Sequence, residues 1–109
     1  MIKIIVLTGL AKTNASEAEW DKEVVPAGKK WTLQELRPYF SRQADTVEAY
    51  LYKATERIVA VNSQPENVLR LPIPIDTVIE AGFELRLTGI TDGTSTGVIV
   101  GVVLDETAA

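Results

Sequence analysis

The pattern that decides the fold class lies in residues 78–87, which read Val78-Ile79-Glu80-Ala81-Gly82-Phe83-Glu84-Leu85-Arg86-Leu87. After the Ala-Gly pair, apolar and polar residues alternate strictly, and a period of two is typical of a β-strand that buries one face. The alternation predicts that Phe83, Leu85 and Leu87 point into a core. A glycine between two apolar segments can take a positive φ angle, which permits a tight turn between strands.

Residues 24–33 repeat this arrangement. A Pro-Ala-Gly turn precedes apolar residues at the third and fifth positions after Gly28, and the same spacing follows Gly82. Two equivalent strand–turn–strand units are expected in a doubled Greek key. The alternative is that two Ala-Gly turns, which are common in β proteins, align by chance.

Apolar alternation and turn residues divide the remaining chain in the same way. Strand segments are expected at residues 2–8, 31–40, 47–52, 57–62, 68–71, 78–79, 83–87 and 98–104. Residues 9–22 are polar, and we expect an irregular segment or arm there, with at most one helical turn. We therefore predict one all-β domain over residues 1–109. Its fold is a two-sheet antiparallel β-sandwich, jelly-roll-like, with about eight strands and little helix.

Two irregularities are predicted within the strands. The apolar residues before and after residues 34–35 have opposite parity, so a β-bulge is expected there. Proline donates no backbone hydrogen bond, which places Pro38 and the extended residues 71–75 at an edge or bend of a sheet.

The composition leaves little material for catalysis. The chain has no cysteine and no histidine, which removes disulfides, thiolate chemistry, the commonest general base and the commonest transition-metal ligand. Neither a phosphate loop nor a dinucleotide fingerprint occurs. We expect no enzymatic activity, no cofactor and no metal. A net charge of −4 without a basic run argues against nucleic-acid binding, and the apolar runs are too short to span a membrane.

The strands expected at residues 2–8 and 98–104 are apolar on both faces, although a two-layer sandwich buries only one face of each strand. Either residues 9–22 or a partner subunit must cover the outer faces. We favour self-association, because covering such a patch is worth several kcal/mol at roughly 25 cal/mol per Å². Glycine in this patch permits close approach. The predicted subunit interface consists of Ile5, Leu7, Ile99, Gly101 and Val103.

Three aromatic residues are candidates for contact with a ligand or partner. Tyr50 and Tyr52 lie on one face of a strand, where they could form a stacking platform for a sugar. Trp20 lies in the polar segment and could anchor that segment to the sandwich or to a neighbour. A carbohydrate- or ligand-binding β-sandwich module is therefore the alternative function.

Residues 24–33 and 83–89, together with the glycine-containing strand at 97–104, resemble small virion proteins of tailed bacteriophages. The resemblance is to capsid decoration (cement) proteins of the jelly-roll type. It implies a non-enzymatic structural protein, made in the host cytoplasm, that forms a homotrimer on the capsid surface of the virion. Such a protein stabilises the capsid by clamping neighbouring subunits of the major capsid protein. An arm for this contact would come from residues 9–22 or from strand exchange.

Overall fold

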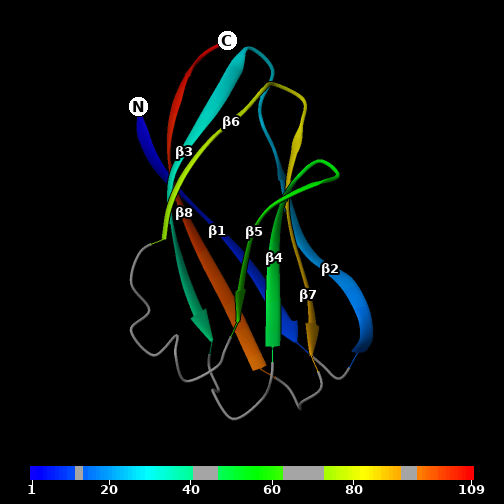
Figure 1. Ribbon diagram of the computed structural model, residues 1–109. Coiled ribbons are helices and arrows are strands. Elements are labelled where there is room, and N and C mark those ends of the chain that lie inside the picture. The colour runs from blue at the N-terminus through cyan, green and yellow to red at the C-terminus, as the bar shows by residue number, and fades with distance from the viewer. Residues whose placement is uncertain (12–13, 41–46, 63–72, 92–95) are drawn as a thin grey trace.

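The structure is a computed structural model that describes residues 1–11, 14–40, 47–62, 73–91 and 96–109. These residues form eight β-strands and no helix (Figure 1). The strands are β1 (Ile2–Ala11), β2 (Asn14–Val24), β3 (Lys29–Phe40), β4 (Val47–Lys53), β5 (Glu56–Asn62), β6 (Ile73–Ile79), β7 (Glu84–Thr91) and β8 (Thr96–Ala108). Accordingly, these residues contain no helix that is long and apolar enough to cross a membrane.

The strands form two antiparallel sheets of four, which face each other in Figure 1. Sheet A has the order β1-β8-β3-β6, and sheet B has the order β2-β7-β4-β5. The chain changes sheet at every connection between described strands except the β4–β5 hairpin. This order is the doubled Greek key of a jelly roll. The predicted fold class is therefore confirmed.

The core lies between the sheets and takes one face from each contributing strand. On β8 the buried row is Val98, Val100, Val102 and Leu104, the parity predicted for it. On β3 the pairing with both neighbours shifts register between Leu33 and Glu35. This shift is the predicted β-bulge, and it allows the apolar residues on both sides of it to face the same core.

The prolines lie where sheet A tolerates them. β6 is an edge strand, and it carries Pro74. β6 pairs with β3 only as far as Leu36, so Pro38 lies beyond the described β6 ladder and interrupts none of its hydrogen bonds. The position of Pro74 on an edge strand agrees with the prediction, whereas residues 71–72, which would continue the chain of β6 beside Pro38, lie outside the described residues. The segment expected at residues 68–71 lies outside the described residues.

The two Ala-Gly turns are structurally equivalent and touch each other. Gly28 and Gly82 have φ angles of 77° and 86°, a conformation that glycine adopts without strain. The Val25 N–H donates to the Phe83 carbonyl, and the Val25 carbonyl accepts from the Gly82 N–H, both at 3.0 Å. The sequence repeat thus marks two connections between the sheets that are fastened side by side.

The polar segment does not have its predicted structure. Instead of an irregular arm at residues 9–22, β1 continues to Ala11 and β2 begins at Asn14. The pairing of β2 with β7 shifts register between Asn14 and Ala18 and again between Glu19 and Asp21. Two shifts within one strand obscure its period of two, which explains why the sequence pattern did not reveal it.

Phe83 also departs from its prediction. Its ring was expected in the core, but the side chain is 46% exposed. β7 begins only at Glu84, and the Phe83 N–H bonds back to the Glu80 carbonyl as the last residue of the turn. Strand alternation therefore does not apply to it.

Candidate functional site

The inward and outward rows of β1 are opposite to those predicted. Leu7 is fully buried and Ile5 packs against the core, so neither belongs to an outer surface. Ile5 pairs with Val102 and Leu7 with Val100, and directly opposed residues of antiparallel strands share a face. Both faces of β1 carry apolar residues, so only the pairing of β1 with β8 shows which face is buried.

The outward row of β1 consists instead of Ile2, Ile4 and Val6, which are between 52% and 60% exposed. Across the ladder, Ile4 lies opposite Val103 and Val6 lies opposite Gly101. Apolar groups from two strands therefore adjoin on the outer side of sheet A.

β8 presents its predicted residues on this side. Ile99 is 42% exposed, and Gly101 and Val103 are half-buried. A Cβ added to Gly101 would contact Arg37 at an ordinary 3.7 Å, so a small side chain would fit at this position without strain. Tyr39 of β3 lies opposite Ile99 and is exposed. We call the whole surface the apolar face; it comprises Ile2, Ile4, Val6, Tyr39, Ile99, Gly101 and Val103.

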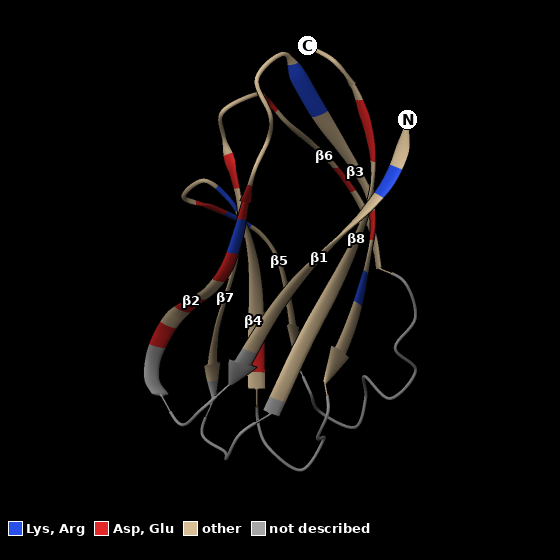
Figure 2. Cartoon of the chain, turned by 180° about the vertical axis from the view of Figure 1, so that it is seen from behind, with Lys and Arg blue, Asp and Glu red and all other residues tan. Residues whose placement is uncertain are grey.

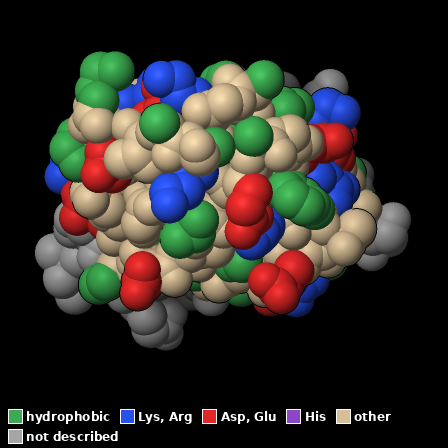
Figure 3. Space-filling model, turned by 90° about the horizontal axis from the view of Figure 1, so that it is seen from above, with side chains coloured by type: hydrophobic (Ala, Val, Ile, Leu, Met, Phe, Trp, Pro, Cys, Tyr) green, Lys and Arg blue, Asp and Glu red, His purple; other side chains and the backbone are tan. Residues whose placement is uncertain are grey.

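An ion pair borders the apolar face on β3. Arg37 lies opposite Gly101 and Glu35 lies opposite Val103, and their side chains are 2.6 Å apart. Since each charge is neutralised by the other, the border does not add a net charge to the apolar face. The end of the molecule that carries both termini is different, because hydrophobic side chains are scattered there among charged ones (Figure 3).

The outer side of sheet B is polar, and its charged side chains form ion pairs with one another. Glu17 on β2 accepts hydrogen bonds from Arg57 at 3.0 Å and from Thr88 at 2.5 Å. Burial raises the pKa of Glu17, but the bonds from Thr88 and Tyr52 and the charge of Arg57 outweigh it and lower the pKa. Nearby, Arg86 donates to Glu19 at 2.7 Å. Among the described residues, sheet B has no apolar outer surface comparable to that of sheet A.

The expected aromatic platform lies on sheet B, but it is covered. Tyr50 is only 6% exposed, and the Arg57 guanidinium lies 3.8 Å from the centroid of its ring. The Tyr50 hydroxyl donates to Glu48, and this bond, with burial and the charge of Glu48, raises the pKa of Tyr50 to about 12. The Tyr52 hydroxyl accepts from Arg57 at 3.1 Å. A sugar would have to displace Arg57 before it could stack on Tyr50.

Trp20 lies inside the sandwich rather than at a ligand or partner surface. Its side chain is partly buried, packs against the core, and extends from Gly9 on sheet A to Gly89 on sheet B. A Cβ on Gly9 would lie 2.8 Å from the Trp20 side chain, and one on Gly89 would lie closer still. Trp20 therefore anchors β2 to both sheets.

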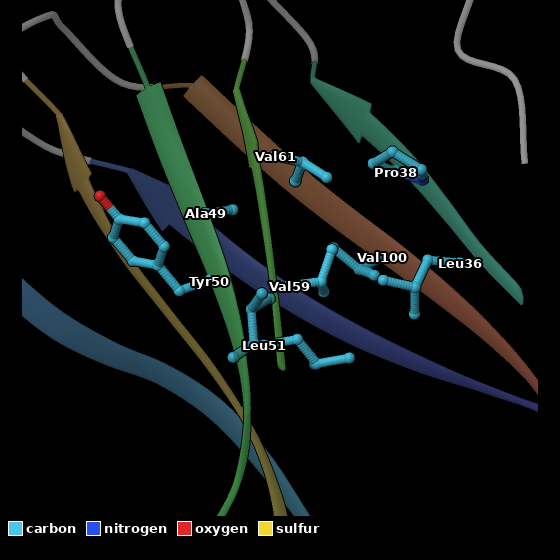
Figure 4. Close-up of a pocket in the computed structure, with 9 residues that line it drawn as sticks. Leu36, Pro38, Ala49, Tyr50, Leu51, Val59, Val61 and Val100 are labelled. Carbon is cyan, nitrogen blue, oxygen red and sulfur yellow. The ribbon is translucent and has the colours of Figure 1, made fainter. Parts of the chain in front are cut away.

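Two hollows on the described part of the molecule bear on ligand binding. One is an apolar void of about 10 Å³ between β3, β4, β5 and β8; Leu36, Val59 and Val100 point into it, whereas the Tyr50 ring points away (Figure 4). That volume is about right for one water molecule and far too small for a ligand. The other is an open depression of about 360 Å³ beside Phe83 and Arg86. The described residues contain no group of three acidic side chains placed to hold a metal ion.

Comparison of the chain with models of known protein families, and with curated protein sequences, finds no match. Evidence for function therefore comes from the surfaces of the molecule. They differ clearly: the outer side of sheet A is apolar and open, whereas that of sheet B is polar and internally paired.

Proposed function

We propose that this chain is a non-enzymatic structural protein that binds other protein subunits through the apolar face of sheet A. The contrast between the two outer sides of the sandwich carries this proposal. Both sheets have the same core to cover, yet only sheet A exposes a cluster of large aliphatic side chains among the described residues. Removing such a cluster from water is favourable by roughly 25 cal/mol per Å².

The specific role that we propose is decoration of a bacteriophage capsid. Jelly-roll domains are a common architecture of viral capsids, and residues 24–33 and 83–89 resemble decoration proteins. A protein that binds only the assembled shell stabilises it by mass action, since dissociation must then also release the bound protein. The apolar face supplies a contact of this kind without any catalytic group.

The test uses one substitution on each outer side. Ile99→Asp places a charge within the apolar face, and Ala60→Asp makes a comparable change at an exposed position on sheet B. Light scattering after size-exclusion chromatography should show a self-associated wild-type protein, a smaller mass for Ile99→Asp, and no change for Ala60→Asp. Circular dichroism should show that both variants remain folded. A folded Ile99→Asp variant with the wild-type mass would exclude the apolar face as the self-association surface.

Co-sedimentation tests the capsid role separately. If a major capsid protein is encoded beside the gene for this chain, the wild-type protein should pellet with shells assembled from that capsid protein, and Ile99→Asp should remain in the supernatant. If the wild-type protein also stays in the supernatant, the capsid role is wrong even if self-association holds.

A further inference from the structure

The edge of β1 offers unpaired backbone groups in a regular row. β1 pairs with β8 alone within sheet A. The Glu106 N–H donates to the Met1 carbonyl at 2.8 Å, whereas the Thr8 N–H donates away from β8, to the Asp21 carboxylate at 2.9 Å. Because these directions alternate along an antiparallel strand, the row that points away from β8 is Ile2, Ile4, Val6 and Thr8.

Asp21 marks where this open edge stops. Its carboxylate accepts a hydrogen bond from the Thr8 N–H, and the neighbouring residue Trp20 packs on Gly9. Toward the start of β1, the N–H and carbonyl groups of Ile2, Ile4 and Val6 have no strand partner among the described residues. An open edge with exposed apolar side chains is a template for another strand.

We propose that β1 pairs with β1 of a second copy of the chain, antiparallel, about a two-fold axis at Ile4. In this register Ile4 faces Ile4 of the second copy, and Ile2 faces Val6 in both halves. All three residues then exchange backbone hydrogen bonds. Moving the register toward the end of β1 would require the N–H of Thr8, which Asp21 already holds. Moving it the other way leaves Val6 unpaired.

The side chains suit this register. On the outer side, every pair across the axis joins two aliphatic residues, which stabilises antiparallel strands. The apolar faces of the two copies become continuous across the joined sheet. This inference therefore deepens the proposed function, because it names a second copy as one of the partner subunits.

Charge is complementary on the inner side. Glu23 lies opposite Leu85, a core residue, so it points inward from the edge strand β2, and it is exposed. The contacts of Thr8 with Asp21 and of Gly9 with Trp20 show that β1 and β2 run antiparallel, which puts Glu23 near the level of Val6. In the proposed register, Lys3 of the second copy would lie opposite Ile5. Ile5 is one residue from Val6, so this lysine would lie close to Glu23. Figure 2 shows acidic residues along β2 and a basic segment near the start of β1.

The contact occurs twice, once on each side of the axis. Lys3 remains available for this contact, because its ion-pair partner in the same chain, Glu106, is 3.5 Å away and the Lys3 side chain is 39% exposed. A two-fold contact builds a dimer, in contrast to the trimer implied by the resemblance to decoration proteins.

Cysteine cross-linking tests the register directly, since the natural chain contains no cysteine. Residues in a hydrogen-bonded antiparallel pair have Cα atoms about 5.5 Å apart, within the range of about 4.4–6.8 Å that a disulfide spans. Ile4→Cys should form a covalent dimer under mild oxidation. Val6→Cys alone should not, because Val6 faces Ile2, whereas an equal mixture of Ile2→Cys and Val6→Cys should form the mixed dimer. Equal cross-linking of Ile4→Cys and Val6→Cys, or none in any sample, would overturn the register.

Ile4→Pro tests the backbone contact. Proline is tolerated where the N–H points away from the sheet, so the variant should stay folded by circular dichroism and lose the β1 dimer in light scattering. Ile99→Asp removes association through the apolar face, so a folded Ile4→Pro/Ile99→Asp variant that remains dimeric would overturn the proposal. Ile99→Asp separates it from the proposed function: cross-linking of Ile4→Cys should persist in an Ile4→Cys/Ile99→Asp double variant. If that cross-link persists and the Ile99→Asp variant also has the wild-type mass in light scattering, the β1 edge contact is supported and the apolar face is excluded as a contact surface.

Discussion

The ring of Trp20 occupies the space that a side chain at Gly89 would need. Gly89→Ala should therefore displace the ring or the strand, and overpacking of this kind costs about 1–3 kcal/mol. For a domain of this length, each kcal/mol lowers the melting temperature by about 4–8 °C. Thermal unfolding followed by circular dichroism measures the loss.

Gly101→Ala is the matched control, because its added Cβ would meet Arg37 at 3.7 Å, an ordinary contact. We expect a change within about 0.5 kcal/mol for this variant. Equal destabilisation by the two alanines would show that the position of Trp20 is not the cause.

Substitutions at turn residues with a positive φ angle should change stability in opposite directions. Gly28 and Gly82 have φ angles that an alanine adopts only with strain, so alanine at either position should destabilise the fold by about 1 kcal/mol or more. Ala54, in the β4–β5 turn, already has a φ of 55° without being glycine. Ala54→Gly should thus be neutral or stabilising in urea denaturation. If Ala54→Gly destabilised the fold as much as Gly82→Ala, strain would not be the reason for either effect.

Glu17 predicts a dependence of stability on acid. The folded state lowers the pKa of Glu17 below its ordinary value of 4.5, so the carboxylate contributes stability above that pH, and the contribution is lost as the pH falls through the folded-state pKa. Glu17→Gln should be less stable than wild type at pH 7. Urea denaturation over a pH series should show the difference shrinking below pH 4.5. A difference that stays constant with pH would mean that Glu17 acts through its shape and not its charge.

Tyr50 predicts an effect at the alkaline end. Its pKa of about 12, against an ordinary 10.0, means that the folded state favours the protonated phenol. The associated stability is complete below pH 10 and is lost as the pH rises through 12. In an absorbance titration of tyrosinate, Glu48→Gln should move one of the three transitions toward 10. Tyr50→Phe should remove that same transition; if it removes another, the assignment is wrong.

The sequence predicts the sandwich well where local rules are strict. The alternation of Leu85 and Leu87 with polar neighbours identifies buried residues of β7, and the change of parity around residues 34–35 locates the bulge in β3. The Ala-Gly turns identify two sheet crossings because the positive φ of glycine is a local requirement. In each case the deciding information lies within a few residues.

The candidate site was harder to predict because its geometry depends on distant partners. Residues 2–7 are apolar on both faces apart from Lys3, and only the pairing of Ile5 with Val102 settles which row is buried. Similarly, no local pattern shows that Arg57 covers Tyr50 or that two glycines make room for Trp20. The open edge of β1 was missed for the same reason, since strand order is a property of the complete sheet.

The place of β8 between β1 and β3 also has a consequence for synthesis. In the chain, Thr96 at the start of β8 comes 94 positions after Ile2 at the start of β1. At roughly 5–20 residues per second, a ribosome needs about 5–20 s to make that stretch. During this time β1 is without β8, the strand that pairs with it in sheet A. The apolar segment that forms β1 must therefore be kept from aggregating until β8 has been made. A chaperone that holds extended apolar segments should bind the nascent chain there.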